Sequence, residues 1–285
     1  MKHLFILNAY AGKKSRVDEF KEKISQLELD GECFVEVTSA HGDATKIARK
    51  YAENNDDFLR VYACGGDGTA NEAMSGLVGF DNCALGVIPA GTGNDFVKSF
   101  DFPKEDFLDL EKMTKGDTVK IDLLKCGDNY AMNTISVGYD CAVAKYAQKI
   151  KRFPLMTGPT AYKVALVYCL FSKRKHTFVP FAELCDGNID FLSIPTVSLL
   201  QFAKLLGVFI KGEHIGHKNA QFIVHKKCKE MQFKNDTPID IGLDGEIFNM
   251  KDPVITVKPE ALSVIIPGKK EKTTEQGILC HSEGV

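Results

Sequence analysis

The sequence lacks the marks of three large protein classes. Its longest apolar stretches, 164–171 and 199–210, are too short or too interrupted to span a bilayer. With 36 Lys and Arg residues against 38 Asp and Glu residues, the net charge is −2, without the basic excess of a duplex nucleic-acid binder. Glycine and proline number 24 and 10, too few for a low-complexity chain. The remaining composition is that of a globular protein of 285 residues, enough for one large domain or two moderate ones.

The nine cysteines form neither a disulfide framework nor a zinc pattern. Their number is odd, none are spaced as C-x-x-C, and most lie in apolar runs. Both a framework and a metal site need tighter clustering. We therefore expect reduced thiols in a cytoplasmic protein. From the charge balance given above, we expect no nucleic-acid partner.

The N-terminal segment imitates a signal peptide but has too short an apolar part. Only residues 4–7 are apolar, against ~7–15 residues in the apolar region of a signal. We interpret this segment as a first β-strand.

Residues 1–122 alternate between strand-like and helical patterns. Apolar strand-like runs occupy 3–8, 34–37, 59–63 and 84–88. Helical periodicity occupies 16–30 and 43–54, and further helices begin near Thr69 and Asn94. This order predicts a parallel sheet covered by helices on both faces. Such sheets bind ligands at the carboxyl ends of their strands, where the glycine-rich turns of this sequence lie.

Residues 123–268 are mostly short strand candidates and predict a mainly antiparallel second domain. A strand at 118–126 leads into this part, and a second strand candidate at 129–137 follows it. Helical stretches follow at about 140–150 and 159–171. The remaining candidates lie at 189–194, 221–225, 230–234, 239–243, 254–257 and 262–266. Residues 269–285 are charged, and we expect a flexible tail there.

Two glycine-rich turns carry the chemistry. Gly65-Gly66-Asp67-Gly68-Thr69 follows a strand and opens a helix, so its bare N–H groups and the helix N-terminus suit a phosphate. A carboxylate beside a phosphate is repulsive unless a cation or a reacting hydroxyl lies between them, which makes Asp67 informative. The alternative is a tight turn with a capping Asp. Gly91-Thr92-Gly93-Asn94-Asp95 repeats the layout after the next strand.

These turns belong to a set of motifs that resembles the diacylglycerol-kinase catalytic-domain family, which includes bacterial soluble lipid kinases and the sphingosine and ceramide kinases. GGDGT alone also fits NAD kinases and phosphofructokinases, so PAGTGNDF at 89–96 discriminates. The resemblance covers roughly 1–267. Its further motifs are N-x-x-x-G at 8–12, T-x-x-x-G-x-A at 38–44, Asp122, N-x-x-S-x-G-x-D at 133–140 and Leu243-Asp244-Gly245-Glu246.

The resemblance implies an α/β fold: a Rossmann-like parallel-sheet nucleotide domain of the NAD-kinase and diacylglycerol-kinase type, followed by a β-sandwich-like, mainly antiparallel domain. It implies ATP and Mg²⁺ as cofactors and transfer of the γ-phosphate to the hydroxyl of diacylglycerol or a similar lipid. The enzyme would be cytoplasmic and peripheral to the inner face of the membrane, where its lipid substrate is presented. The sequence leaves open whether the protein forms a homodimer.

The resemblance also assigns roles residue by residue. Asp67, Asp95 and Asp122 match carboxylates of a magnesium–water network, and Glu246 matches the general base that activates the lipid hydroxyl. The residues alone favour a solvated hairpin charge for Glu246 and an outward-pointing side chain for Asp122. Glu183, Asp186 and the carbonyl of Asn188 match a structural magnesium site, with a solvated turn as the alternative. The positions that match ATP contacts are Asn8, Gly12, Thr38, Gly65, Gly66, Gly68, Thr69, Asn71 and Thr92.

One departure from the family pattern concerns the second domain. Only KRKHTFV separates the helix ending near residue 171 from the segment that begins at Pro180, so a few dozen residues are expected to be missing near residue 178. Such a deletion would remove part of the lipid pocket wall. The alternative function is therefore a nucleotide-binding protein of the same fold with impaired or no kinase activity.

Overall fold

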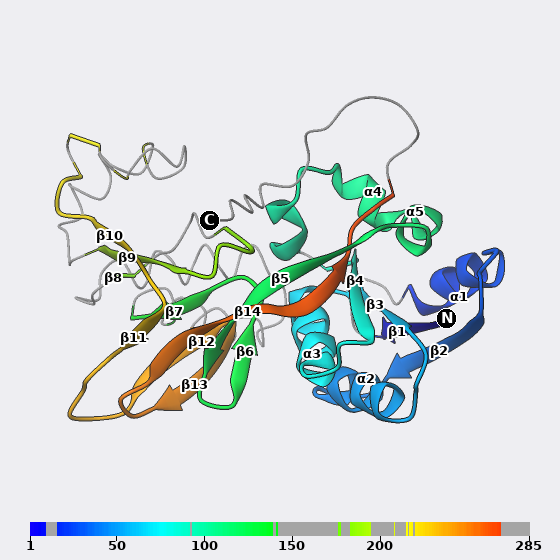
Figure 1. Cartoon of the computed structure of the whole chain (residues 1–285), viewed down its shortest axis with the longest axis horizontal. Helices are drawn as coiled ribbons and strands as arrows, with labels where there is room; N and C mark the ends of the chain where they lie inside the picture. The colour runs from blue at the N-terminus through cyan, green and yellow to red at the C-terminus, as the bar shows by residue number, and fades with distance from the viewer. Residues whose placement is uncertain are drawn as a thin grey trace, which may run out of the picture. The chain divides into compact units, whose positions relative to one another are not determined.

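The structure is a computed structural model that describes residues 1–9, 16–91, 93–138, 141, 176–177, 183–194, 208, 215, 217–218 and 220–268. The chain divides into two compact units (Figure 1). The first contains Met1–Leu123, Leu184–Asp186 and the chain from Lys258 onward. The second contains Leu124–Glu183 and Gly187–Val257. Residues 258–268, expected in the second domain from the sequence, thus belong to the first unit.

The first unit is built on parallel strands. β1 (Lys2–Asn8), β2 (Glu32–Thr38), β3 (Leu59–Gly65) and β4 (Cys83–Pro89) lie in the order β2-β1-β3-β4, followed by β14 (Val254–Ile265) and β5 (Thr118–Cys126). β3 and β4 are buried along their whole length. Continuous burial without alternation is typical of strands covered on both faces. The register pairs Gly65 with Pro89, so the last residues of β3 and β4 lie side by side.

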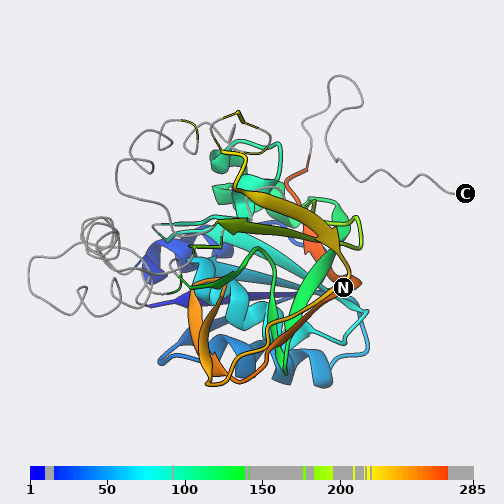
Figure 2. The same ribbon diagram turned by 90° about the vertical axis from the view of Figure 1, so that its left-hand side faces the viewer.

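Helices cover both faces of this sheet (Figures 1 and 2). On β2, Phe34 packs against Tyr51 of α2 (Asp43–Glu53) with ring centroids 5.2 Å apart. Cys33 and Val35 instead line a groove with Ile24 of α1 (Val17–Ser25). Because successive strand residues point to opposite faces, α1 and α2 lie on opposite sides of β2.

The helix that follows the first glycine turn, α3 (Asp67–Leu77), packs closely on α2. A Cβ added at Gly76 would lie 2.5 Å from the Thr45 carbonyl oxygen and 2.8 Å from the Ala48 Cβ. Only glycine fits there, because the backbone atoms of α2 occupy the space. This contact fixes α3, and with it the turn at its N-terminus.

Several elements differ from the sequence-based expectation, and the strands expected at 254–257 and 262–266 are one continuous strand, β14. The helix expected from Asn94 is a short 3₁₀ turn, η1 (Phe96–Ser99), followed by α4 (Lys104–Leu108) and α5 (Leu110–Thr114). Asn94 has a φ of 52° and bonds through its side chain to Gly91, so the turn continues past it. The strand expected at 129–137 is divided into β6 (Asn129–Ala131) and β7 (Ile135–Val137), because the amides between them bond to a side chain rather than to a strand.

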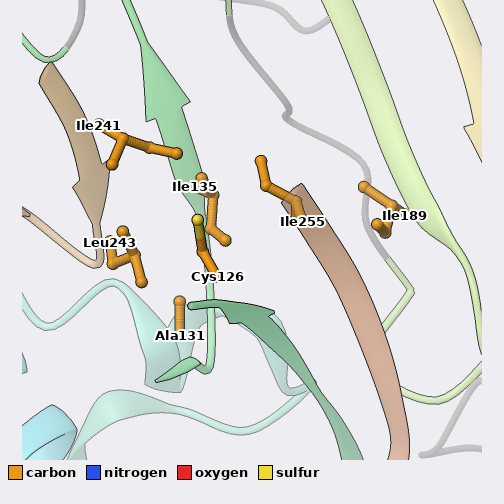
Figure 3. Packing of buried hydrophobic residues seen from close by; sticks show 7 residues of the cluster. All are labelled: Cys126, Ala131, Ile135, Ile189, Ile241, Leu243 and Ile255. Carbon is orange, nitrogen blue, oxygen red and sulfur yellow. The ribbon is translucent and has the colours of Figure 1, made fainter. Parts of the chain in front are cut away.

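The second unit contains antiparallel sheets. β12 (Ile239–Leu243) pairs with β13 (Glu246–Met250) and with β7. β9 (Ile189–Ile194) pairs with β8 (His176–Thr177) and β10 (Val224–Cys228), and β11 (Glu230–Gln232) pairs with β14. The predicted fold class, a parallel-sheet domain followed by antiparallel sheets, is confirmed. The core of this unit is an apolar cluster shown in Figure 3: Cys126, Ala131, Ile135, Ile189, Ile241, Leu243 and Ile255.

Several expectations lie outside the described residues: the helices at 140–150 and 159–171, the gap near residue 178 and the tail at 269–285. The expectation that every cysteine is a reduced thiol is wrong for Cys185, which is disulfide-bonded. Among the helices that the structure describes, none combines the length and hydrophobicity needed to cross a membrane.

Candidate functional site

The two glycine turns touch each other at the carboxyl ends of β3 and β4. The amides of Ala90 and Gly91 donate to the Gly65 carbonyl oxygen at 2.8 and 3.1 Å. A Cβ on Gly91 would lie only 2.4 Å from the Cα of Gly66, so the second turn can reach the first only with glycine at 91. The structure therefore brings together the two turns that the sequence placed at the carboxyl ends of the strands.

Gly68 differs from the other glycines of the first turn. A Cβ on Gly65 would lie 2.3 Å from the Thr69 hydroxyl oxygen, whereas a Cβ on Gly68 would meet no atom within 4 Å. Packing within the described protein thus explains Gly65 but not Gly68. An exposed glycine in the first turn of α3 leaves the backbone open to a close approach by a ligand.

Asp67 fastens the second turn to the first. Its two carboxylate oxygens accept hydrogen bonds from the backbone amides of Asn94 and Asp95, each at 2.7 Å. The sequence alone suggested a cation or a reacting hydroxyl as the partner of Asp67. The structure adds a second role, because these bonds hold the loop after β4 at the N-terminus of α3.

Asp67 and Asp95 present their carboxylates to one region. The point where a Gly93 Cβ would stand lies 2.7 Å from Oδ2 of Asp67 and 3.7 Å from Oδ2 of Asp95. Carboxylate oxygens are the ligands that Mg²⁺ prefers, so this pair fits a hard cation. Asp95 also forms an ion pair with Lys98, but the two side chains are 61% and 65% exposed, so Mg²⁺ bound here would displace a solvated ammonium group.

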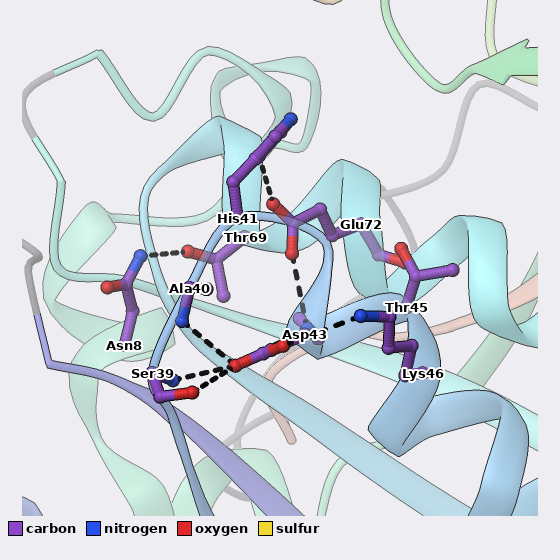
Figure 4. Close-up of polar contacts among 10 residues, drawn as sticks. Asn8, Ser39, Ala40, His41, Asp43, Thr45, Lys46, Thr69 and Glu72 are labelled. Atoms are coloured by element: carbon purple, nitrogen blue, oxygen red, sulfur yellow. Dashed lines mark hydrogen bonds and ion pairs between the residues drawn. The ribbon is translucent and has the colours of Figure 1, made fainter.

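The predicted ATP contacts on β1 and α3 are also adjacent. The Asn8 side-chain amide, at the end of β1, donates to the Thr69 hydroxyl oxygen at 2.7 Å (Figure 4). Thr38 ends β2 and is buried, and Asn71 is buried within α3. Because parallel strands share one carboxyl edge, Asn8, Thr38 and Gly65 end at the same edge of the sheet. Gly12 and Thr92 lie outside the described residues.

Glu72 is a site residue whose role the sequence reasoning missed. One carboxylate oxygen accepts the Ala44 amide in the first turn of α2 at 3.2 Å, and the other lies 2.7 Å from Nδ1 of His41 (Figure 4). The signal was its place in the helix that the first glycine turn opens, where it lies about one helical turn beyond Thr69. Glu72 therefore joins the loop after β2 to α3.

Asp43 closes the same loop. Its Oδ2 accepts the Ser39 hydroxyl at 2.6 Å and the amides of Ser39 and Ala40 at 2.9 Å each (Figure 4). These hydrogen bonds hold the pKa of Asp43 below its usual value, and the bond from the Ser39 hydroxyl has the largest effect. The loop beside Thr38 is thus ordered by its own carboxylate.

Asp122 lies on β5. Its Oδ1 accepts the Glu260 amide on β14 at 2.9 Å, and its own amide donates to the Leu184 carbonyl oxygen at 2.7 Å. These contacts do not include Asp67 or Asp95, so its place in a magnesium network stays a prediction.

Glu246 begins β13 in the second unit, after the Asp244-Gly245 turn. Asp244, another residue that the sequence reasoning left without a role, organises that turn. Its carboxylate accepts the amides of Met132, Asn133 and Thr134 at 2.7–3.0 Å, and its φ is 46°. The hairpin that carries Glu246 is therefore tied to the segment between β6 and β7.

The predicted structural metal ligands lie in the turn before β9. Glu183 is exposed, and its Oε1 lies 3.4 Å from Nζ of Lys227 on β10. Asp186 and Asn188 are partly buried in the same turn. Glu183 fits poorly as a metal ligand beside this ammonium group, and metal binding by the turn stays a prediction.

Comparisons with known proteins agree with this site. The family model of the diacylglycerol kinase catalytic domain matches residues 2–126, which include both glycine turns. This part of the chain is therefore similar to the diacylglycerol kinase catalytic domain. A protein of Bacillus subtilis (strain 168) named diacylglycerol kinase is 27% identical over 297 residues, 93% of this chain and 96% of that protein. The corresponding protein of Staphylococcus aureus (strain MRSA252) is 27% identical over 271 residues, 85% of this chain and 84% of its own.

The solved structures show the same fold. A crystal structure of a diacylglycerol kinase from Bacillus anthracis str. Sterne superposes with a TM-score of 0.60 at 19% identity, covering 93% of this chain and 96% of that one. Another from the same organism gives 0.67. The alignment with the Bacillus subtilis protein is longer than this chain, so the chain lacks residues that this relative has. Their position near residue 178 stays a prediction.

Proposed function

We propose that this chain is an ATP- and Mg²⁺-dependent lipid kinase that phosphorylates the hydroxyl of diacylglycerol or a similar lipid at a membrane surface. The observation that carries the proposal is the joined pair of glycine turns, with Asp67 and Asp95 facing the same region. The match of residues 2–126 to the diacylglycerol kinase catalytic domain and the names of the relatives support the substrate class.

In this proposal the first unit binds and orients the nucleotide. The open backbone at Gly68 and the positive end of α3 bind phosphate oxygens. Asn8 and Thr69, already bonded to each other, position polar groups at the end of β1. Asp67 and Asp95 would hold Mg²⁺, which neutralises charge on the phosphates when bound.

The transfer step needs a base, and we assign it to Glu246. The lipid hydroxyl gives its proton to the Glu246 carboxylate while its oxygen bonds to the γ-phosphorus. The bond from that phosphorus to the bridging oxygen breaks, and ADP leaves. Asp244 positions this base by fixing the hairpin on which it stands.

Phosphoryl transfer from radiolabelled ATP to diacylglycerol in mixed micelles with MgCl₂ tests the proposal. We expect Glu246→Gln to bind ATP normally and to transfer phosphate ~10²–10⁴-fold more slowly, the range for a positioned acid–base group. Glu230→Gln is the matched control, because Glu230 is an exposed glutamate on a strand of the same unit.

Wild-type protein that binds ATP but phosphorylates none of a panel of diacylglycerols, sphingosines and ceramides would favour the non-kinase alternative. Transfer at the wild-type rate by Glu246→Gln would remove Glu246 from the mechanism while leaving the kinase assignment in place.

A further inference from the structure

A buried carboxylate, that of Asp190, follows the turn before β9. Asp190 on β9 lies directly opposite Lys227 on β10 in the antiparallel register. Its side chain is only 2% exposed, yet it carries a carboxylate. A buried carboxylate is costly unless its charge is compensated.

Two side chains of β10 compensate Asp190. Nε2 of His225 lies 2.7 Å from Oδ1 of Asp190, and Nζ of Lys227 lies 3.8 Å from Oδ2. His225 and Lys227 are two residues apart on one strand, so both point to the same face of the sheet. Oδ2 of Asp190 is buried without a hydrogen bond, which leaves the Lys227 ammonium group as the described charge beside it.

The same ammonium group reaches Glu183. Its Nζ lies 3.4 Å from Oε1 of Glu183, so Lys227 stands between the carboxylate that opens the turn and the one that follows it on β9. Two carboxylates that converge on one point are an arrangement that usually holds a divalent ion through oxygen ligands. Here a positive charge that belongs to the chain occupies the space between them and would repel a divalent ion.

We propose that Lys227 replaces a structural metal: its ammonium group neutralises Glu183 and Asp190, and the turn before β9 folds without a divalent ion. The positive charge that stabilises the turn is then always present as the Lys227 side chain, so the stability of the turn does not depend on the concentration of Mg²⁺. This inference is independent of the proposed activity, because Glu183, Asp190 and Lys227 take no part in the proposed transfer.

Thermal unfolding of the full-length protein, followed by circular dichroism in EDTA and in excess MgCl₂, tests it. In EDTA we expect Lys227→Met to unfold about 2–4 °C below wild type, because the substitution leaves the buried Asp190 carboxylate without this ammonium group. Lys226→Met, which removes the exposed neighbouring lysine, should unfold with wild type. MgCl₂ should raise the Tm of Lys227→Met more than that of wild type, and adding Glu183→Gln should abolish this excess.

Two results would overturn the proposal. One is a Lys227→Met protein as stable in EDTA as Lys226→Met. The other is a wild-type Tm that falls in EDTA, recovers in MgCl₂ and loses this response with Glu183→Gln, because the ion would then occupy the turn despite Lys227. If Lys227→Met does not fold, Lys227→Arg keeps the charge and should have the Tm of wild type in EDTA. The response of the wild-type Tm to EDTA and MgCl₂, compared with that of Glu183→Gln, then remains decisive.

Discussion

Replacing Asp67 by alanine separates its structural from its chemical role. The substitution removes two hydrogen bonds from backbone amides to a carboxylate, both 2.7 Å long. Hydrogen bonds to charged groups contribute about 1.5–3 kcal/mol each, and Asp67 is only partly buried. We therefore expect the free energy of unfolding to fall by about 3 kcal/mol, and the rate of phosphoryl transfer to fall ~10²–10³-fold.

Urea denaturation followed by circular dichroism measures the first effect, and single-turnover phosphoryl transfer measures the second. Asp56→Ala is the matched control, because Asp56 is an exposed aspartate in the turn between α2 and β3. Asp67→Asn retains one acceptor oxygen and should lose about half of the stability that Asp67→Ala loses.

A double-mutant cycle with Gly93→Ala makes the reasoning refutable. The new Cβ would lie 2.7 Å from Oδ2 of Asp67, so Gly93→Ala should cost less stability in the Asp67→Ala background than in wild type. We expect a coupling free energy of about 1–2 kcal/mol. Additive effects, or an Asp67→Ala protein as stable as the Asp56→Ala control, would show that Asp67 does not fasten the second turn.

Three further predictions concern single residues. Gly68→Ala should raise the free energy of unfolding by about 0.5–1 kcal/mol, because alanine is the better helix residue and its Cβ meets no atom within 4 Å. Calorimetry should nevertheless show weaker ATP binding by this variant. An unchanged ATP affinity would mean that the phosphates bind elsewhere. Burial lowers the pKa of His3, so as the pH falls the unfolded chain binds a proton at this histidine before the folded protein does. Below pH ~6.5 the free energy of unfolding of wild type should therefore fall, by up to ~1.4 kcal/mol per pH unit, relative to that of His3→Gln. Parallel pH profiles of the two proteins in urea titrations would contradict this. Asp244→Ala should lower stability by about 2–4 kcal/mol and speed hydrogen exchange of the amides at 132–134, and wild-type exchange there would refute its bonding role.

The sequence was sufficient for the strands and for the position of the glycine turns. Continuous apolar runs at 59–63 and 84–88, each followed by glycines, indicate buried parallel strands with loops at one edge, and β3 and β4 confirm this. Local patterns carry that information because burial and turn chemistry act over a few residues.

The partners of the polar side chains were not predictable in the same way. Asp67 bonds to amides 27 and 28 residues away, and Asp244 bonds to amides 110–112 residues away. Nothing in the neighbouring residues specifies such partners, since they are set by how the strands are ordered. The same limit explains why the strand expected at 129–137 is interrupted, because the side chain that interrupts it lies on a distant hairpin.

The return of the chain along β14 affects how the protein can be produced and divided. Ser263–Ile265 pair with β4, so the first unit receives one of its strands only after the second unit has been synthesised. During translation, the edge of β4 stays unpaired until that point, and unpaired strand edges promote aggregation. A fragment cut after residue 126, where the family match ends, would keep this exposed edge. A stable isolated first unit would therefore need residues 258–268 joined to it by a linker.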